Sequence, residues 1–280
     1  MKINGPKIIA VSSGKGGVGK TNFVANLALL YAGMNKKVVI FDADLGLSNI
    51  DVLFGLAPRF NLKHVFLGEK KFKDIIVKGP SGIMIIPASS GVRALTNLTV
   101  EHKLRLIADV ENFSPECDLF LIDTGAGISD NVLFFCSAAQ DVIVIVTPEP
   151  TSLADAYALI KILSRDFGGK HFRILVNTAR TEKEAHDTFR KLYIVADKFL
   201  SISLDYLGYL PFDQHVKDSI IAQRGFLTMY PNSSFAKKLA EIGRKLMDTG
   251  YDYIEDNASK RATGAQKIPV QFFKKAFRVD

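Results

Sequence analysis

The sequence of 280 residues contains no tryptophan and only two cysteines, Cys117 and Cys136. Two cysteines that lack the pairwise spacing of a metal site provide neither a disulfide framework nor a structural zinc centre. No apolar run near the start is long enough to span a bilayer or to form a secretory segment. We therefore expect a reduced, cytoplasmic protein in which both cysteines are inert core residues.

Excess charge is also scarce outside the C-terminal end. The formal net charge is +7, but the residues from Asn257 onward hold six basic side chains and one acidic side chain, a net +5. Residues 1 to 256 therefore carry only +2, and this body needs no acidic partner such as nucleic acid on charge grounds. The length and the 48% hydrophobic content fit one large globular domain.

Short apolar runs alternate with amphipathic stretches along most of the chain. Continuous apolar strands joined by helices are typical of a parallel sheet that is covered on both faces. We expect an α/β fold with a mostly parallel, doubly wound sheet, helices on both faces and one domain over residues 1–250. The predicted strands lie at 7–11, 38–42, 83–87, 119–123, 142–146, 172–176 and 204–210, and the predicted helices near 20–34, 100–112, 130–139, 152–166, 182–199 and 232–248.

A glycine-rich stretch, S-G-K-G-G-V-G-K-T-N at residues 13 to 22, follows the first predicted strand. It matches the phosphate-loop pattern G-x-x-x-x-G-K-[ST] between a strand and a helix. The glycines let backbone amides converge on phosphates, Lys20 reaches the β and γ oxygens, and the Thr21 hydroxyl binds magnesium. The residues expected to hold the nucleotide here are Gly14, Lys15, Gly16, Gly17, Val18, Gly19, Lys20, Thr21 and Asn22.

Three aspartates lie at the ends of predicted strands, where ligands collect in open α/β sheets. Asp123 closes L-F-L-I-D and fits the acidic residue that holds magnesium, directly or through water. Asp42 and Asp44 end the second strand, where an aspartate serves either a site or only a turn. The expected metal residues are Thr21, Asp44 and Asp123, and the lack of an N-K-x-D stretch favours ATP over GTP.

Several motifs together resemble those of a known family. K-G-G-V-G-K-T with its extra lysine, D-A-D-L-G-L-S-N-I-D and L-I-D-T-G-A-G are similar to the deviant P-loop ATPases of the MinD and ParA class. Within this class, A-D-L-G-L-S-N-I-D-V-L-F-G-L, P-A-S-S-G and P-E-P-T-S-L-A-D-A-Y-A-L-I-K resemble the flagellar-number regulators called FlhG or FleN. The resemblance runs from about residue 7 to about residue 250, and Asn22 favours this branch over the cell-division MinD proteins.

The resemblance implies a homodimer that forms with ATP and Mg²⁺. Lys15 would reach across the dimer interface to the nucleotide of the other subunit, where an added ammonium stabilises developing phosphate charge. Lys20 would hold phosphate, Asp44 would position the attacking water, and Asp123 would sense the γ-phosphate through magnesium. The expected catalytic residues are thus Lys15, Lys20 and Asp44.

The resemblance also implies an adenine pocket. Asn177 and the segment Pro211, Phe212 and Asp213 would line it, although both stretches also fit ordinary strand exits. Asp155 would touch the partner subunit, or lie on a helix surface without a role.

The C-terminal end has its own pattern. Residues 251–268 lose periodicity and predict a linker, and residues 269–280 predict an amphipathic helix. This helix would bind an anionic membrane surface, or pack on its own domain. Dimerisation would raise the membrane avidity, so we expect peripheral association with the inner face of the plasma membrane, a polar location included. The membrane residues would be Phe272, Phe273, Lys274, Lys275, Phe277 and Arg278.

The function implied by the resemblance is an ATPase switch that regulates flagellar number or placement. Only six residues precede the first predicted strand, without the D-Q-A-x-x-L-R motif that activates the GTPase FlhF, so a σ54-dependent activator similar to FleQ is the favoured partner. A ParA-like DNA-partitioning ATPase and a MinD-like division-site regulator are the alternatives. The low body charge makes direct DNA binding a weaker expectation, and an iron-sulfur reductase would need cluster cysteines after Asp123.

Overall fold

The structure is a computed structural model that describes residues 6–46, 48–88, 95, 97–113, 116–167 and 171–248. The predicted linker at 251–268 and the predicted amphipathic helix at 269–280 lie outside the described residues. The six membrane residues proposed from Phe272 to Arg278 lie outside them as well.

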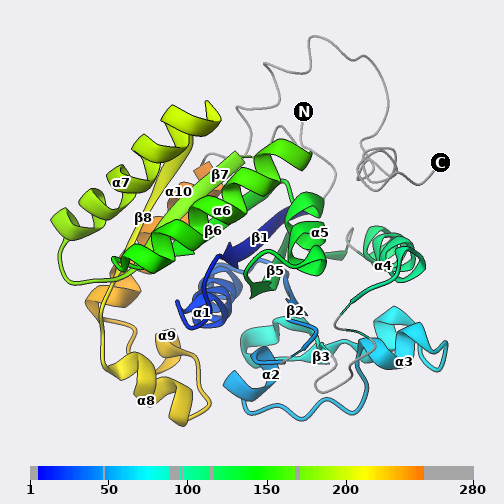
Figure 1. The fold of residues 1–280 in the computed structure, drawn as a ribbon. Helices are drawn as coiled ribbons and strands as arrows, with labels where there is room; N and C mark the ends of the chain where they lie inside the picture. Colours follow the sequence, from blue (N-terminus) through cyan, green and yellow to red (C-terminus); the bar gives the residue numbers. More distant parts are fainter. Residues whose placement is uncertain are drawn as a thin grey trace.

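An eight-stranded sheet forms the centre of the molecule, with the strand order β3-β4-β2-β5-β1-β6-β7-β8 (Figure 1). Every neighbouring pair is parallel except β3 with β4. The strands are β1 (Lys7–Ser13), β2 (Val38–Ala43), β3 (Val77–Lys78), β4 (Met84–Ile86), β5 (Leu119–Ala126), β6 (Asp141–Val146), β7 (His171–Ala179) and β8 (Leu204–Pro211).

Helices cover both faces of this sheet (Figure 1). In β1, Ile8 and Ala10 belong to one hydrophobic core and Ile9 and Val11 to the other, because successive side chains of a strand point to opposite faces. Helices α1 (Lys20–Gly33), α9 (Phe226–Met229) and α10 (Ser234–Asp248) pack on the second face. The first face is covered by α4 (Val100–Phe113), α5 (Asp130–Ala138), α6 (Pro150–Phe167) and α7 (Glu182–Leu200).

The predicted α/β class, the seven predicted strands and the six predicted helices are confirmed. The elements that the sequence did not predict are short and contain too few residues to show a hydrophobic period. They are β3, α2 (Ile50–Leu53), α3 (Leu62–Phe66), η1 (Phe72–Ile75), η2 (Pro80–Gly82), α8 (His215–Ile221) and α9.

The cysteines are core residues, as predicted. Cys117 and Cys136 are both buried and neither forms a disulfide. Burial raises the pKa of the Cys117 thiol to about 12, so this thiol is protonated and unreactive at neutral pH. In the described part of the chain, no helix has both the length and the apolar character that crossing a membrane requires.

The register of the central strands brings the predicted site residues to one edge of the sheet. Asp42 in β2 and Val11 in β1 both lie directly opposite Asp123 in β5. The glycine-rich loop leaves β1 at the same edge and leads into α1. The carboxyl ends of β1, β2 and β5 therefore converge where the sequence predicts nucleotide.

Candidate nucleotide site

The loop between β1 and α1 has a backbone that requires glycine at several positions. Gly17 and Gly19 have φ angles of 76° and 92°, in the left-handed region that is strained for other residues. Gly14 is constrained by space instead, since a Cβ there would lie 2.1 Å from the carbonyl carbon of Asp155 in α6. The loop is therefore packed against α6 on one side.

Gly14→Ala is expected to destabilise the protein by about 3 kcal/mol, because the added methyl group cannot fit without moving α6 or the loop. Gly16→Ala is the matched control, since a Cβ at Gly16 meets no atom within 4 Å. Thermal unfolding without nucleotide measures both effects. Equal melting temperatures for the two variants would contradict this account of the loop.

Lys20 opens α1 and points back into the loop. Its side chain is buried, and Nζ donates a hydrogen bond of 2.9 Å to the Ser13 hydroxyl. Burial lowers the pKa of Lys20, while the nearby carboxylates of Asp123 and Asp44 act in the opposite direction. The ammonium is thus held in place before a phosphate arrives, which suits electrostatic stabilisation of phosphate oxygens.

Asp123 is fully buried in the second half of β5 and hydrogen-bonds the Thr21 side chain. Among the described residues, its Oδ1 atom has no hydrogen-bond partner. A buried carboxylate oxygen without a donor, beside a threonine hydroxyl, suits Mg²⁺, which takes few protein ligands and keeps water and phosphate oxygens. Asp44 is also close, since a Cβ at Gly125 would lie 3.7 Å from the Asp44 carboxyl carbon. The predicted metal residues thus lie together.

Burial, and then the charge of Asp42, raise the pKa of Asp123 from 3.8 to about 8. A raised pKa in the folded state stabilises the fold at low pH, and this stabilisation is lost as pH rises through about 8. Asp123→Asn should therefore stabilise the nucleotide-free chain at about pH 9 by on the order of 2 kcal/mol, and by little at about pH 5.

Chemical unfolding at the two pH values measures this effect. The control is Asp187→Asn, which changes an exposed carboxylate on α7. A pH-independent effect of Asp123→Asn would show that the carboxylate is not protonated in the folded chain.

Asp42 organises the segment that carries Asp44. Its carboxylate accepts hydrogen bonds from the Ser48 hydroxyl and from the backbone N–H groups of Asp44, Asn49 and Ile50, at 3.0 to 3.2 Å. Burial raises its pKa to about 6. The turn role that the sequence left open for Asp42 fits this geometry, because four donors of the surrounding segment bond to its carboxylate.

Lys15 is engaged within its own chain. Its Nζ lies 2.6 Å from Oε2 of Glu149, just before α6, and 3.2 Å from the hydroxyl of Thr151 in the first turn of α6. The Lys15 and Glu149 side chains are 40% and 60% exposed, so this ion pair is a weak one that another anion can replace. The sequence did not predict this contact between Lys15 and Glu149.

Asn177 braces the phosphate loop. Its Nδ2 donates a 2.7 Å hydrogen bond to the Val18 carbonyl, and a Cβ on Gly19 would lie 2.4 Å from the same nitrogen. Asn177 lies near the end of β7, and the neighbouring strand β8 ends at Pro211. Phe212 is 67% exposed beyond it, and the Asp213 carboxylate accepts from the His215 backbone N–H.

The remaining predicted residues have different surroundings. Asn22 accepts a 2.8 Å hydrogen bond from Asn26, which in turn accepts one from the Leu227 N–H, so this pair ties α1 to α9. Asp155 is exposed on α6, with its backbone against Gly14.

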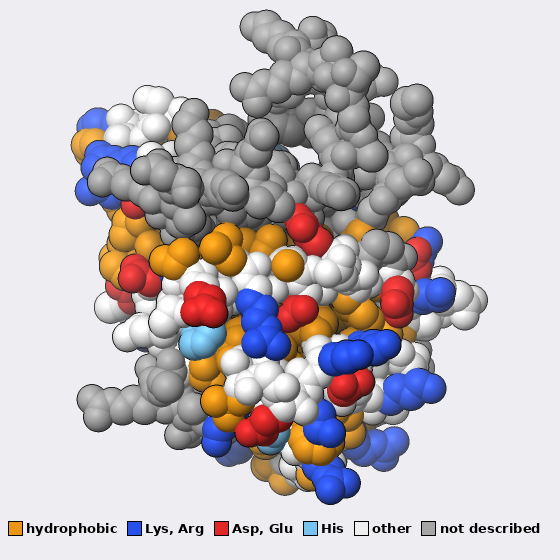
Figure 2. Space-filling model, turned by 90° about the vertical axis from the view of Figure 1, so that its right-hand side faces the viewer, with side chains coloured by type: hydrophobic (Ala, Val, Ile, Leu, Met, Phe, Trp, Pro, Cys, Tyr) orange, Lys and Arg blue, Asp and Glu red, His pale blue; other side chains and the backbone are white. Residues whose placement is uncertain are grey.

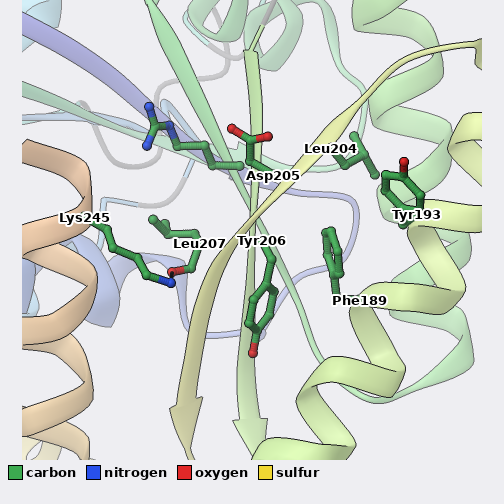
Figure 3. Close-up of a pocket in the computed structure, with 8 residues that line it drawn as sticks. Phe189, Tyr193, Leu204, Asp205, Tyr206, Leu207 and Lys245 are labelled. Carbon is green, nitrogen blue, oxygen red and sulfur yellow. Dashed lines mark hydrogen bonds between the residues drawn. The ribbon is translucent and has the colours of Figure 1, made fainter. Parts of the chain in front are cut away.

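A cleft lies away from the nucleotide site. This cleft has a volume of about 490 Å³ and lies beside the edge strand β8, between α7 and α10 (Figure 3). It lies near the amino ends of β7 and β8, whereas the phosphate loop is at the carboxyl ends. Lys245 donates a 3.2 Å hydrogen bond to the Leu207 carbonyl and so occupies part of the strand edge. The side chains that line the cleft include Arg173, Phe189, Tyr193, Asp205, Tyr206 and Lys245.

Comparison with known proteins decides the family. The family model for ParA, described as an NUBPL iron-transfer P-loop NTPase, matches residues 4–247. The chain belongs to the ParA family of P-loop NTPases. It is accordingly an ATPase that uses ATP and Mg²⁺, and Lys20 and Thr21 stand at the positions of the phosphate-loop motif. No group of three or more His, Cys, Asp or Glu residues that could hold a metal occurs in the described ranges.

Two curated relatives are similar over most of their length. The antiactivator FleN of Pseudomonas aeruginosa is 42% identical over 240 residues, which is 86% of each chain. The flagellum site-determining protein YlxH of Helicobacter pylori is 34% identical over 273 residues, 97% of this chain and 88% of that protein. The predicted membership of the MinD and ParA class, with similarity to its flagellar branch, is confirmed.

Solved structures of MinD share the fold. A chain of the MinC:MinD cell division protein complex of Aquifex aeolicus superimposes with a TM-score of 0.72 at 23% identity, covering 87% of this chain and 96% of that chain. MinD of Pyrococcus horikoshii, solved with Mg-ADP, gives a TM-score of 0.69 at 21% identity, covering 91% of this chain and all of that one.

Proposed function

We propose that this chain is an ATP-dependent dimerising switch that regulates the number or placement of flagella. The observation that carries the proposal is the 42% identity to an antiactivator, FleN, over 86% of both chains. The relative YlxH, named as a flagellum site-determining protein, supports the same branch. We propose that residues 1–250 form the ATPase domain of this switch.

In the proposed cycle, the phosphate loop and Lys20 would bind the phosphates of ATP, and Thr21 and Asp123 would hold Mg²⁺, which would neutralise phosphate charge. Asp44 accepts a hydrogen bond from the attacking water and orients it in line with the γ-phosphate. Asp42 keeps Asp44 in position through its four hydrogen bonds. Hydrolysis removes the γ-phosphate and releases the dimer.

Lys15 is the proposed link between nucleotide state and dimerisation. In the single chain its ammonium is paired with Glu149. In the dimer it would exchange this exposed carboxylate for the phosphates bound by the partner subunit, a denser negative charge. Asp155, exposed on the same α6 that packs against Gly14, would then face the partner.

The base of ATP is proposed to lie between Asn177 and the segment Pro211, Phe212 and Asp213. The exposed Phe212 ring offers a surface for stacking. Because Asn177 also bonds to the Val18 carbonyl, it would couple the base to the phosphate loop.

The proposed partner is a FleQ-like σ54-dependent activator, with the GTPase FlhF as a second candidate. The C-terminal residues Phe272, Phe273, Lys274, Lys275, Phe277 and Arg278 are proposed to bind the anionic inner face of the plasma membrane, at a cell pole or elsewhere. A ParA-like role on DNA or a MinD-like role in division remains the alternative, favoured by the ParA family match, by the 33% identity over 214 residues to a MinD of Synechocystis and by the shared fold.

Size-exclusion chromatography with purified FleQ from Pseudomonas aeruginosa tests the proposal. We expect this chain to co-elute with FleQ in ATP and to separate from it in ADP. Lys20→Ala, which should not bind nucleotide, is the control and should elute alone. Separate elution of the unmodified chain and FleQ in both nucleotides would contradict the proposed partner.

A further inference from the structure

The small basic excess of the body is concentrated in one segment. Residues 59 to 78 hold six basic side chains, of which five are lysines, and two acidic ones, Glu69 and Asp74, for a net +4. Since residues 1 to 256 carry +2 in total, the remainder of this body is at −2. The segment is therefore a positive region on a body, residues 1 to 256, that is otherwise slightly negative.

We define the α3 basic patch as Arg59, Lys63, Lys70, Lys71 and Lys73 with Leu67. All its basic residues except the half-buried Lys70 are exposed. None of the five forms an ion pair with a described residue. Figure 2 looks onto the side of the molecule that carries α3 and α4, and Lys and Arg side chains gather over its lower part between hydrophobic ones. Their charge is available to an anionic partner.

An apolar side chain projects among these charges. Leu67 follows α3 directly and is 60% exposed. Its neighbour Phe66 packs against the His102 ring, with centroids 4.5 Å apart, and its carbonyl accepts a hydrogen bond from Arg105 in α4. The base of Leu67 is thus fixed to the body while its side chain is presented outward.

We propose that the α3 basic patch binds the surface of an anionic lipid bilayer. Lysines act as point charges that need no matched geometry, which suits a fluid layer of lipid headgroups. The exposed Leu67 adds apolar surface that can enter the interface, as in peripheral membrane proteins.

Nucleic acid fits this patch less well. The ring that could stack on a base, Phe60, is covered by Lys70 Nζ at 4.2 Å from its centroid and by Arg59 Cζ at 5.3 Å. Base stacking is a main source of affinity for single-stranded nucleic acid, and here the ring face is occupied. Duplex DNA, which needs only charge, is an outcome that the experiment distinguishes.

This inference goes beyond the proposed function, in which only the C-terminal residues contact the membrane. The patch lies on the β3–β4 side of the sheet and follows α2, which is anchored to Asp42 through the Ile50 N–H. Bilayer contact here would orient the ATPase body on the surface in addition to tethering it.

The test is co-sedimentation of the full chain in ADP with vesicles of phosphatidylcholine alone or mixed with phosphatidylglycerol. Lys63→Glu with Lys73→Glu should lower binding to the mixed vesicles by at least about 25-fold, since each basic residue contributes about 5-fold. The matched control, Lys183→Glu with Lys237→Glu, makes the same charge change at exposed sites on α7 and α10 and should have a far smaller effect.

Leu67→Ser completes the test, because it keeps all charges. It should weaken binding to mixed vesicles and leave binding to a short DNA duplex unchanged. Equal vesicle binding by the patch and control variants, or loss of duplex binding without loss of vesicle binding in the patch variant, would overturn the inference. ATP hydrolysis by each variant should match the unmodified chain, so failure here would be distinct from failure of the proposed ATPase switch.

Discussion

Asp44→Ala is expected to slow ATP hydrolysis by about 1000-fold, the effect of removing a group that orients or deprotonates a reacting water. ATP binding should be retained, because Lys20, Thr21 and Asp123 are untouched. The dimer should therefore accumulate with ATP bound. Phosphate release measures the rate, and the nucleotide that co-elutes with the protein on gel filtration measures occupancy.

The control for this variant is Asp187→Ala, at an exposed position on α7, which should hydrolyse ATP normally. An Asp44→Ala protein that stays monomeric with ATP bound would contradict the assigned role. Asp42→Ala is a useful contrast, since loss of an acceptor for four donors should also lower the melting temperature.

Lys15→Ala is expected to keep nucleotide binding and to weaken ATP-dependent dimerisation by at least about 100-fold. The reason is that a desolvated ammonium paired with phosphate across an interface contributes on the order of 3 kcal/mol, whereas its exposed pair with Glu149 contributes little. Binding of a fluorescent ATP analogue and sedimentation velocity measure the two properties separately.

Glu149→Gln separates a cross-subunit role of Lys15 from a local one. This change removes the ion pair within the chain and keeps the Lys15 ammonium, which still lies 3.2 Å from the Thr151 hydroxyl. If Lys15 acts on the partner's nucleotide, Glu149→Gln should dimerise at least as well as the unmodified chain. If the Lys15–Glu149 contact only braces the loop, both variants should fail alike.

The phosphate loop and the strands around it could be predicted from sequence because their signals are local. β2 and β5 begin with continuous apolar runs at 38–41 and 119–122, and the glycine pattern defines the turn between β1 and α1. Parallel strands ending at one edge then place Asp42 and Asp123 together, as their register confirms. These predictions need no knowledge of distant contacts.

Other features depend on contacts between distant parts of the chain. Lys15 and Glu149 are separated by 134 positions, and Asn177 and Val18 by 159, so neither contact has a local pattern. The hydrogen bonds of Asp42 depend on the path of the segment to Ile50, and the sequence alone left its role open between site and turn. The helix α3 is too short to show a hydrophobic period in the sequence. The sequence therefore did not predict that the basic residues around it form one patch.

The central claim, that ATP joins two copies of this chain, is tested most directly by light scattering of the full-length Asp44→Ala protein with Mg²⁺ and either ATP or ADP. The account predicts a mass of twice the 30.8 kDa chain in ATP and the mass of one chain in ADP. It also predicts that adding Lys15→Ala returns the ATP sample to 30.8 kDa. The same mass in both nucleotides would contradict the claim.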